Sequence, residues 1–316
     1  MKKILFVLFT ISVLFFIGCS SEPTVWYTDL EQATIEAEKN NKDLLIFFSG
    51  MGWDGYSEKY FNEILSTDEF LQEAGKNFVA LHLNIVADES NLTEEEIITN
   101  QTNYMIANSM GVGTIPMVFA TSMEGVPFAF FTYNESSSLE TTLEQLVATG
   151  ETSKKIKSLT KQLNKTSGIE KAKIIDELYY SVPAEFSYQF SDLIREFPSL
   201  DPENKTGKLG EYKLVLAYEE AMIIYQESGD IQGATQVFLD LAESGILTPE
   251  EYQYAYYQAA FVESYGAQIL TENTLPYLQI AYDAAPDSYL ATGLISEAIN
   301  TINSLLESEL SIGENQ

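Results

Sequence analysis

Few residues of this chain have the types and spacing that chemistry needs, and the most suggestive pair lies in the stretch Trp53-Asp54-Gly55-Tyr56-Ser57. Asp54 and Ser57 place a carboxylate three residues before a hydroxyl. Such a pair takes part in non-redox catalysis only with a neighbouring base or a metal ion. The sequence shows neither beside them, so we expect no catalytic residue, no metal site and no cofactor.

The single cysteine and the single histidine restrict the remaining chemistry. Cys19 is the only cysteine, which excludes internal disulfides, cysteine-type zinc sites and redox pairs. His82 lies in an alternating pattern over residues 79–86, which favours a residue of a strand over a catalytic base. A Cys–His system is therefore impossible in the body of the protein, and nothing in the sequence points to a Ser–His one.

Two segments are expected to position the Trp53–Ser57 stretch. The apolar run Leu44–Phe48 predicts a buried strand, followed by a glycine-rich turn and a helix from Tyr56 to Leu71 with a break at residues 66–68. About sixty residues after the turn, Ile115-Pro116 opens a second strand. A proline is tolerated there because it lies at the first residue of the strand.

This arrangement resembles the redox region of thioredoxin-like domains of exported bacterial proteins, whose turn carries Trp-Cys-x-x-Cys-Lys. Asp54 and Ser57 occupy the two cysteine positions, and neither a carboxylate nor a hydroxyl can carry out thiol–disulfide exchange. Residues 113–119 resemble the cis-proline segment of the same family, which implies a cis Ile115-Pro116 peptide lying against the turn. The resemblance implies a vestigial thioredoxin site made of Trp53, Asp54, Gly55, Tyr56, Ser57, Ile115 and Pro116.

The resemblance covers residues 25–150 and implies an α/β domain with a mixed central sheet and helices on both faces. An acidic insertion at residues 88–94 is expected to be a solvated loop. Periodicity predicts the remaining elements: a helix ending at Asn40-Asn41, a central strand Phe78–Val86, a helix Glu95–Met110, a strand Phe128–Tyr133, and a helix Leu139–Thr149 that ends before Gly150.

Beyond Gly150 the strand patterns stop, and residues 151–312 are predicted to form helices separated by Gly, Pro and Asp breaks. The pattern resembles tetratricopeptide repeats, which are helix pairs of about 34 residues, and it implies an all-α helical-repeat domain. A further helix is expected to start at Thr248-Pro249. Within residues 218–249 the family's positions are met by Tyr218, Tyr225, Gly229-Asp230, Ala234 and Phe238, although Met222 replaces its small glycine.

The predicted helix Tyr252–Tyr265 carries more tyrosines than one neighbouring helix can cover. Most aromatic residues of such a region pack in the core. Tyr254 and Tyr257, however, lie on a different part of the helix from Tyr252 and Tyr256. We therefore expect Tyr254 or Tyr257 to be partly exposed and to contact a partner, because tyrosine supplies a large contact area and a hydroxyl to bond.

The N-terminal residues predict export and a lipid anchor. Residues 1–18 combine a basic start with an apolar run too short to span a bilayer, which is typical of a signal peptide. Residues 16–21 resemble a bacterial lipobox, which implies lipidation of Cys19 and a tether over residues 19–24. The protein is then anchored to a bacterial membrane and faces the periplasm or the exterior.

Charge excludes one class of partner. The formal net charge is −30, and Arg195 is the only arginine. A surface this acidic repels phosphate backbones, so we expect no nucleic-acid partner.

These observations favour a redox-inactive thioredoxin-like lipoprotein that binds a protein or peptide partner, or acts as a scaffold, in the bacterial cell envelope. The alternative is a thioredoxin-family enzyme or a chaperone-like protein that acts on envelope proteins by a non-dithiol mechanism. A third hypothesis is a purely structural role in envelope organisation. Affinity capture of the mature protein from its own envelope separates them, because they differ in whether a defined polypeptide is held.

Overall fold

The computed structural model describes residues 25–267 and 271–313, and the chain divides into two compact units after Lys154. The predicted signal peptide, the lipidation site Cys19 and the tether up to residue 24 lie outside the described residues. Within the described ranges, no helix combines the length and the hydropathy needed to cross a membrane.

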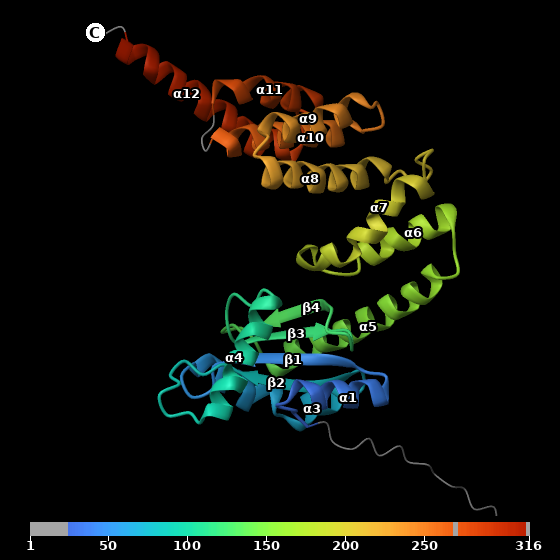
Figure 1. The fold of residues 1–316 in the computed structure, drawn as a ribbon, viewed down its shortest axis with the longest axis vertical. Coiled ribbons are helices and arrows are strands. Elements are labelled where there is room, and N and C mark those ends of the chain that lie inside the picture. Colours follow the sequence, from blue (N-terminus) through green and yellow to red (C-terminus); the bar gives the residue numbers. More distant parts are fainter. Residues whose placement is uncertain (1–24, 268–270, 314–316) are drawn as a thin grey trace, which may run out of the picture. The chain divides into compact units, whose positions relative to one another are not determined.

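The first unit is built on a four-stranded mixed sheet (Figure 1). β1 runs parallel to β2 and antiparallel to β3, and β3 is antiparallel to β4. Every residue of β1 is buried, and because successive side chains of a strand point to opposite faces, both faces of the sheet are covered. The predicted fold class of this unit is confirmed. The strands, in the spatial order β2-β1-β3-β4, are β1 (Asp43–Ser49), β2 (Phe78–Asn84), β3 (Met117–Thr121) and β4 (Pro127–Thr132).

Helices cover this sheet, and the first of them shows how local sequence sets their ends. At the start of α1, Asp29 accepts the backbone N–H of Gln32 at 2.8 Å, and at its end Asn41 takes a left-handed conformation with φ of 52°. Ala33 and Ala37 are fully buried and allow α1 to lie against β1 and β2. The helices are α1 (Leu30–Asn40), α2 (Gly55–Tyr60), the π-helical turn η1 (Phe61–Leu65), α3 (Asp68–Ala74), α4 (Glu94–Ser109) and α5 (Leu139–Leu163).

Strand β2 is not central, so this part of the prediction is wrong. It stands at one end of the strand order, beside β1. Its outer edge is nevertheless covered by Tyr27, whose N–H donates to the Ala80 carbonyl and whose carbonyl accepts the His82 N–H, both at 2.8 Å. The apolar alternation of β2 resembles that of an inner strand because the middle of the strand is paired on both edges.

Helix α5 is longer than predicted. It runs for 25 residues, so Gly150 lies inside it and does not end it. Close packing accounts for the glycine, because a Cβ at this position would lie 2.5 Å from Nδ2 of Asn77. Ser153, beyond the predicted end, donates its hydroxyl to a carboxylate oxygen of Asp43 at the start of β1.

The second unit is helical, and its consecutive helices from α8 to α11 pack on one another. The C-terminal all-α class is therefore confirmed, while the tetratricopeptide resemblance stays a prediction. The elements are α6 (Gly168–Tyr179), the 3-10 helix η2 (Ala184–Phe190), α7 (Ser191–Leu200), α8 (Leu209–Ser228), α9 (Ile231–Glu243), α10 (Pro249–Ala267), the 3-10 helix η3 (Glu272–Thr274), α11 (Leu275–Ala284), the π-helical turn η4 (Ala291–Ile295) and α12 (Ser296–Gly313).

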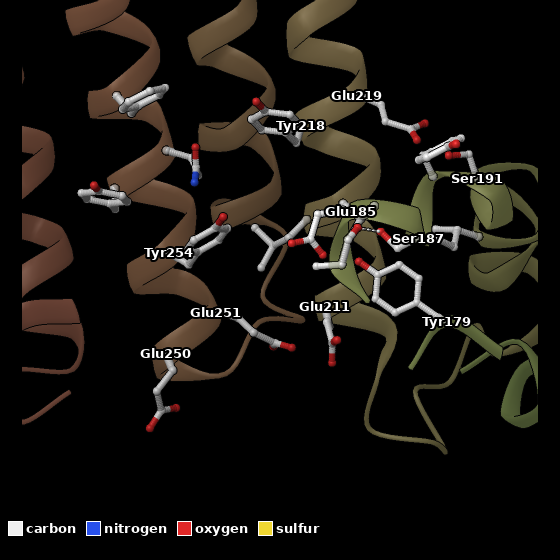
Figure 2. Close-up of a pocket in the computed structure, with 18 residues that line it drawn as sticks. Tyr179, Glu185, Ser187, Ser191, Glu211, Tyr218, Glu219, Glu250, Glu251 and Tyr254 are labelled. Carbon is white, nitrogen blue, oxygen red and sulfur yellow. Dashed lines mark hydrogen bonds between the residues drawn. The ribbon is translucent and has the colours of Figure 1, made fainter. Parts of the chain in front are cut away.

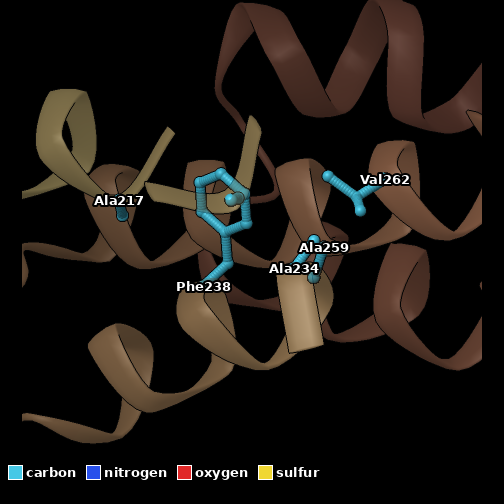
Figure 3. Close-up of a cluster of buried hydrophobic side chains, with 6 residues drawn as sticks. Ala217, Ala234, Phe238, Ala259 and Val262 are labelled. Atoms are coloured by element: carbon cyan, nitrogen blue, oxygen red, sulfur yellow. The ribbon is translucent and has the colours of Figure 1, made fainter. Parts of the chain in front are cut away.

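A cluster of small side chains around Phe238 joins α8, α9 and α10 (Figure 3). Phe238 has no exposed surface. Small neighbours allow the helices to come close, and the single large ring fills the space between them. The other members of the cluster are Ala217, Ala221, Ala234, Ala259 and Val262.

The breaks between these helices follow the sequence signals. Gly229 ends α8 with a φ of 68°, a conformation that favours glycine, and the next residue, Asp230, caps α9. At the start of α10, Thr248 N–H donates to Glu251 at 2.8 Å, and Glu251 N–H donates to the Thr248 hydroxyl at 3.2 Å. The predicted helix start at Thr248-Pro249 is confirmed.

Candidate functional site

The first candidate site is the turn between β1 and α2, where Asp54 and Ser57 hold each other. One Asp54 carboxylate oxygen accepts the Ser57 backbone N–H at 2.8 Å and the Ser57 hydroxyl at 2.5 Å. The Ser57 hydroxyl in turn accepts the Gly50 N–H at 2.9 Å, and Ser57 has no exposed surface. Both side chains are therefore occupied in closing the turn and capping α2.

The structure brings the turn and the proline segment together. A Cβ on Gly50 would lie 2.6 Å from the Trp53 indole and 2.8 Å from Cδ1 of Ile115, so these three residues are in close contact. The Ile115-Pro116 peptide is cis, as predicted. The Trp53 indole N–H donates to the Ile85 carbonyl at 2.7 Å while about half of the side chain remains exposed.

Tyr56 is the other exposed ring of the turn. It is 54% exposed, and its ring centroid lies 6.1 Å from that of Tyr133. The turn therefore presents two aromatic side chains to solvent, Trp53 and Tyr56, and holds Asp54 and Ser57 in internal hydrogen bonds. The turn supplies no thiol.

Comparison with known proteins agrees with this geometry. A family model described as "Thioredoxin-like domain" matches residues 30–146, which contain both the turn and Pro116. The N-terminal unit is a thioredoxin-like domain. A second family model, described as "Uncharacterised protein C-terminal domain", matches residues 209–308 in the helical unit.

Two relatives and one solved structure show how far the similarity extends. A Treponema pallidum (strain Nichols) protein, "Uncharacterized protein", is 24% identical over 292 residues, which are 92% of each chain. "Thioredoxin-related protein DsbJ" of Chlamydia pneumoniae is 25% identical over 104 residues, which are 33% of this chain and 29% of that protein. The structure "DsbH Oxidoreductase" is 19% identical, with a TM-score of 0.34, and the match covers 40% of this chain and 83% of that one.

His82 belongs to a series of hydrogen-bonded polar side chains inside the thioredoxin-like domain. Its Nε2 is 2.6 Å from the Ser49 hydroxyl, which donates to Asn84 Oδ1 at 3.1 Å. A hydroxyl has one proton, so His82 Nε2 donates to Ser49. Ser49 is fully buried and its proton is committed to Asn84, so the pair is not an accessible nucleophile and base. The sequence did not indicate this contact because it depends on the register between β1 and β2.

We expect His82 to make the domain less stable on acidification. Burial lowers the pKa of His82 from 6.5 to about 4. The unfolded chain therefore binds a proton below pH 6.5, whereas the folded chain does so only near pH 4. The free energy of unfolding should fall across this window by up to ~3 kcal/mol, and the stability is fully present above pH 6.5.

Urea unfolding between pH 4 and pH 7 measures this effect. The control is His82→Gln, whose side-chain amide does not titrate and still carries an N–H for Ser49. The free energy of unfolding of the variant should still depend on pH through the carboxylates, but the part of the pH dependence that is due to His82 should be lost. Equal pH dependence of the two chains would contradict the assignment.

The second candidate site is a groove in the helical unit, with a volume of about 950 Å³, which we call the tyrosine groove (Figure 2). Tyr254 is 41% exposed and lines it together with the partly buried Tyr257, so the predicted exposure is confirmed. The aromatic side chains of the groove are Tyr179, Tyr188, Tyr218, Tyr254, Tyr257 and Phe261.

The groove is assembled from elements far apart in the sequence. Figure 2 shows Tyr254 from α10, Tyr218 from α8 and Glu185 from η2 directed toward the same space. Tyr218 and Tyr188 are 46% and 61% exposed. The sequence singled out the tyrosines of α10 but not Tyr188 or Glu185, because it does not show which elements face α10.

Proposed function

We propose that this thioredoxin-family protein is exported, is anchored by a lipid on Cys19, and holds a protein partner non-covalently in the bacterial cell envelope. The tyrosine groove is the binding surface, and its half-exposed tyrosines are the observation that carries the proposal. Half-exposed rings in a groove offer a large contact area at low entropic cost. Without a cysteine pair in the turn, binding has to be non-covalent.

Export and anchoring are supported by the N-terminal sequence. The basic start, the short apolar run and the small residue before Cys19 are the features of a lipoprotein signal. The similarity to a protein named as thioredoxin-related is compatible with this placement. Asp54 and Ser57 are hydrogen-bonded to each other, which favours a binding role of the turn over chemistry at these two side chains.

A second candidate function is chaperone-like action on envelope proteins by a non-dithiol mechanism. Its specific support is the pair of exposed rings, Trp53 and Tyr56, beside the Ile115-Pro116 segment. In this case the turn, and not the groove, makes the main contact with a polypeptide. Variants of the two sites distinguish the two functions.

Tyr254→Ala is expected to weaken partner binding by about 1 to 2 kcal/mol, the scale of an ordinary interface anchor. The partner is captured by cross-linking the mature protein in its own envelope, purified, and titrated against wild type and variants. The matched control is Tyr289→Ala, because Tyr289 is 92% exposed and lies outside the groove. Binding that is lost with Trp53→Ala but unchanged with Tyr254→Ala would assign recognition to the turn.

A further inference from the structure

The charges of the tyrosine groove point to the kind of partner that fits it. Its lining includes no lysine or arginine among the described side chains, and it includes the carboxylates of Glu185, Glu211, Glu219, Glu250 and Glu251. Clustered carboxylates repel one another and attract cations. A carboxylate that already has a hydrogen-bond or ion-pair partner within the chain has less need of a cation from a ligand. The carboxylates without such a partner therefore indicate where the positive charge of a ligand binds.

Three of the five carboxylates are already compensated within the chain. Glu211 pairs with Lys208 at 2.9 Å, and Glu219 pairs with Arg195 at 3.0 Å. Glu251 is used in the cap of α10, where it accepts the Thr248 N–H.

Glu185 and Glu250 differ from these three. Both are exposed, and neither forms an ion pair with a cation in the described part of the chain. They come from different elements, η2 and α10. The groove therefore has two glutamates whose charge is left to solvent or to a partner.

The protein itself shows how such a surface receives a cation. The ammonium of Lys208 lies 5.0 Å from the centroid of the Tyr180 ring and 2.9 Å from the Glu211 carboxylate. Glu211 also accepts the Tyr180 hydroxyl. At the edge of this groove, one lysine ammonium is thus held by the face of a tyrosine ring and by a carboxylate together.

We propose that the tyrosine groove binds an extended, basic segment of a protein, with lysine or arginine side chains paired to Glu185 and Glu250 and their stems packed on Tyr218 and Tyr254. This inference rests on the proposed function and names the chemistry of the partner. Lys and Arg pack their methylene stems on apolar surface while the charged head pairs elsewhere. The net charge of −30 attracts any basic chain at long range, but the two unpaired glutamates select where it docks.

The test begins with a random dodecamer peptide library selected against the mature full-length chain. We expect enrichment of peptides that carry lysine or arginine together with apolar residues. Enrichment of acidic or uncharged peptides would overturn the inference and leave the proposed function standing. Failure to enrich any peptide, or enriched peptides that bind a Tyr218→Ala/Tyr254→Ala chain equally well, would instead contradict the proposed function.

The affinity of the best enriched peptide is then measured at low and at physiological salt. Glu185→Gln/Glu250→Gln should weaken binding about five- to tenfold at low salt and reduce its salt dependence. Glu220→Gln/Glu227→Gln removes the same charge from exposed positions outside the groove and should change the affinity less than about twofold. Equal losses for the two pairs would overturn the inference, and so would displacement of the peptide by spermidine at a similar affinity, because the groove would then take a free polyamine.

Discussion

Replacing Asp54 and Ser57 together by cysteine is expected to give this chain insulin disulfide reductase activity that the native turn lacks. The turn has the accessibility that a pair of reactive cysteines needs. Position 54 is partly exposed, position 57 is fully buried, and Ile115 lies beside Gly50 and Trp53. The more accessible thiol can attack a disulfide, and the buried thiol can resolve the mixed disulfide. The chain used carries Cys19→Ala, so that the two new thiols are the only ones.

The single variants are the controls. Asp54→Cys alone should form a mixed disulfide and stop, because no second thiol releases it, and Ser57→Cys alone should be unreactive because the position is buried. The Cys19→Ala chain without further changes should show no turnover above buffer. Turnover by that chain, or a folded double variant with two titratable thiols and no activity, would contradict the account of the turn.

Phe238→Ala is expected to destabilise the helical unit by about 3 to 5 kcal/mol. The ring is fully buried, and the residues around it are mostly alanines, which are too short to fill the space that it leaves. The cavity therefore remains, and its cost adds to the loss of apolar burial. Hydrogen exchange at the amides of α8, α9 and α10 measures the change in this unit alone.

The matched control is Phe261→Ala, which removes the same ring from a position that is 50% exposed. It should cost less than about 1 kcal/mol because water already contacts the ring. Similar losses for both variants would mean that the cluster around Phe238 relaxes to close the cavity.

The thioredoxin-like part could be predicted because its signals are local. The strand, the glycine turn and the helix follow one another directly in the sequence, and Ile115-Pro116 is a recognisable segment on its own. The errors concern contacts between distant residues. Helix α5 continues through Gly150, and that glycine is needed because it packs against Asn77. Strand β2 has the sequence pattern of an inner strand because Tyr27 pairs with its outer edge.

For the candidate sites, too, local features could be predicted and contacts between distant elements could not. Exposure of Tyr254 followed from the spacing of tyrosines along one helix. The groove around it also needs η2, α7 and α8, and their placement results from packing that no local pattern records. The contact between Ser49 and His82 likewise needed the pairing of β1 with β2.

The Asp54–Ser57 turn differs from a turn with two cysteines in how it responds to redox conditions. A turn with two cysteines exists in two forms, and the ratio between them follows the redox potential of its surroundings. The Asp54–Ser57 turn has one covalent form, because a carboxylate and a hydroxyl neither gain nor lose electrons under those conditions. A change in the redox potential of the surroundings should therefore leave the covalent state of Asp54 and Ser57 unchanged, whereas it would convert a cysteine pair from one form to the other.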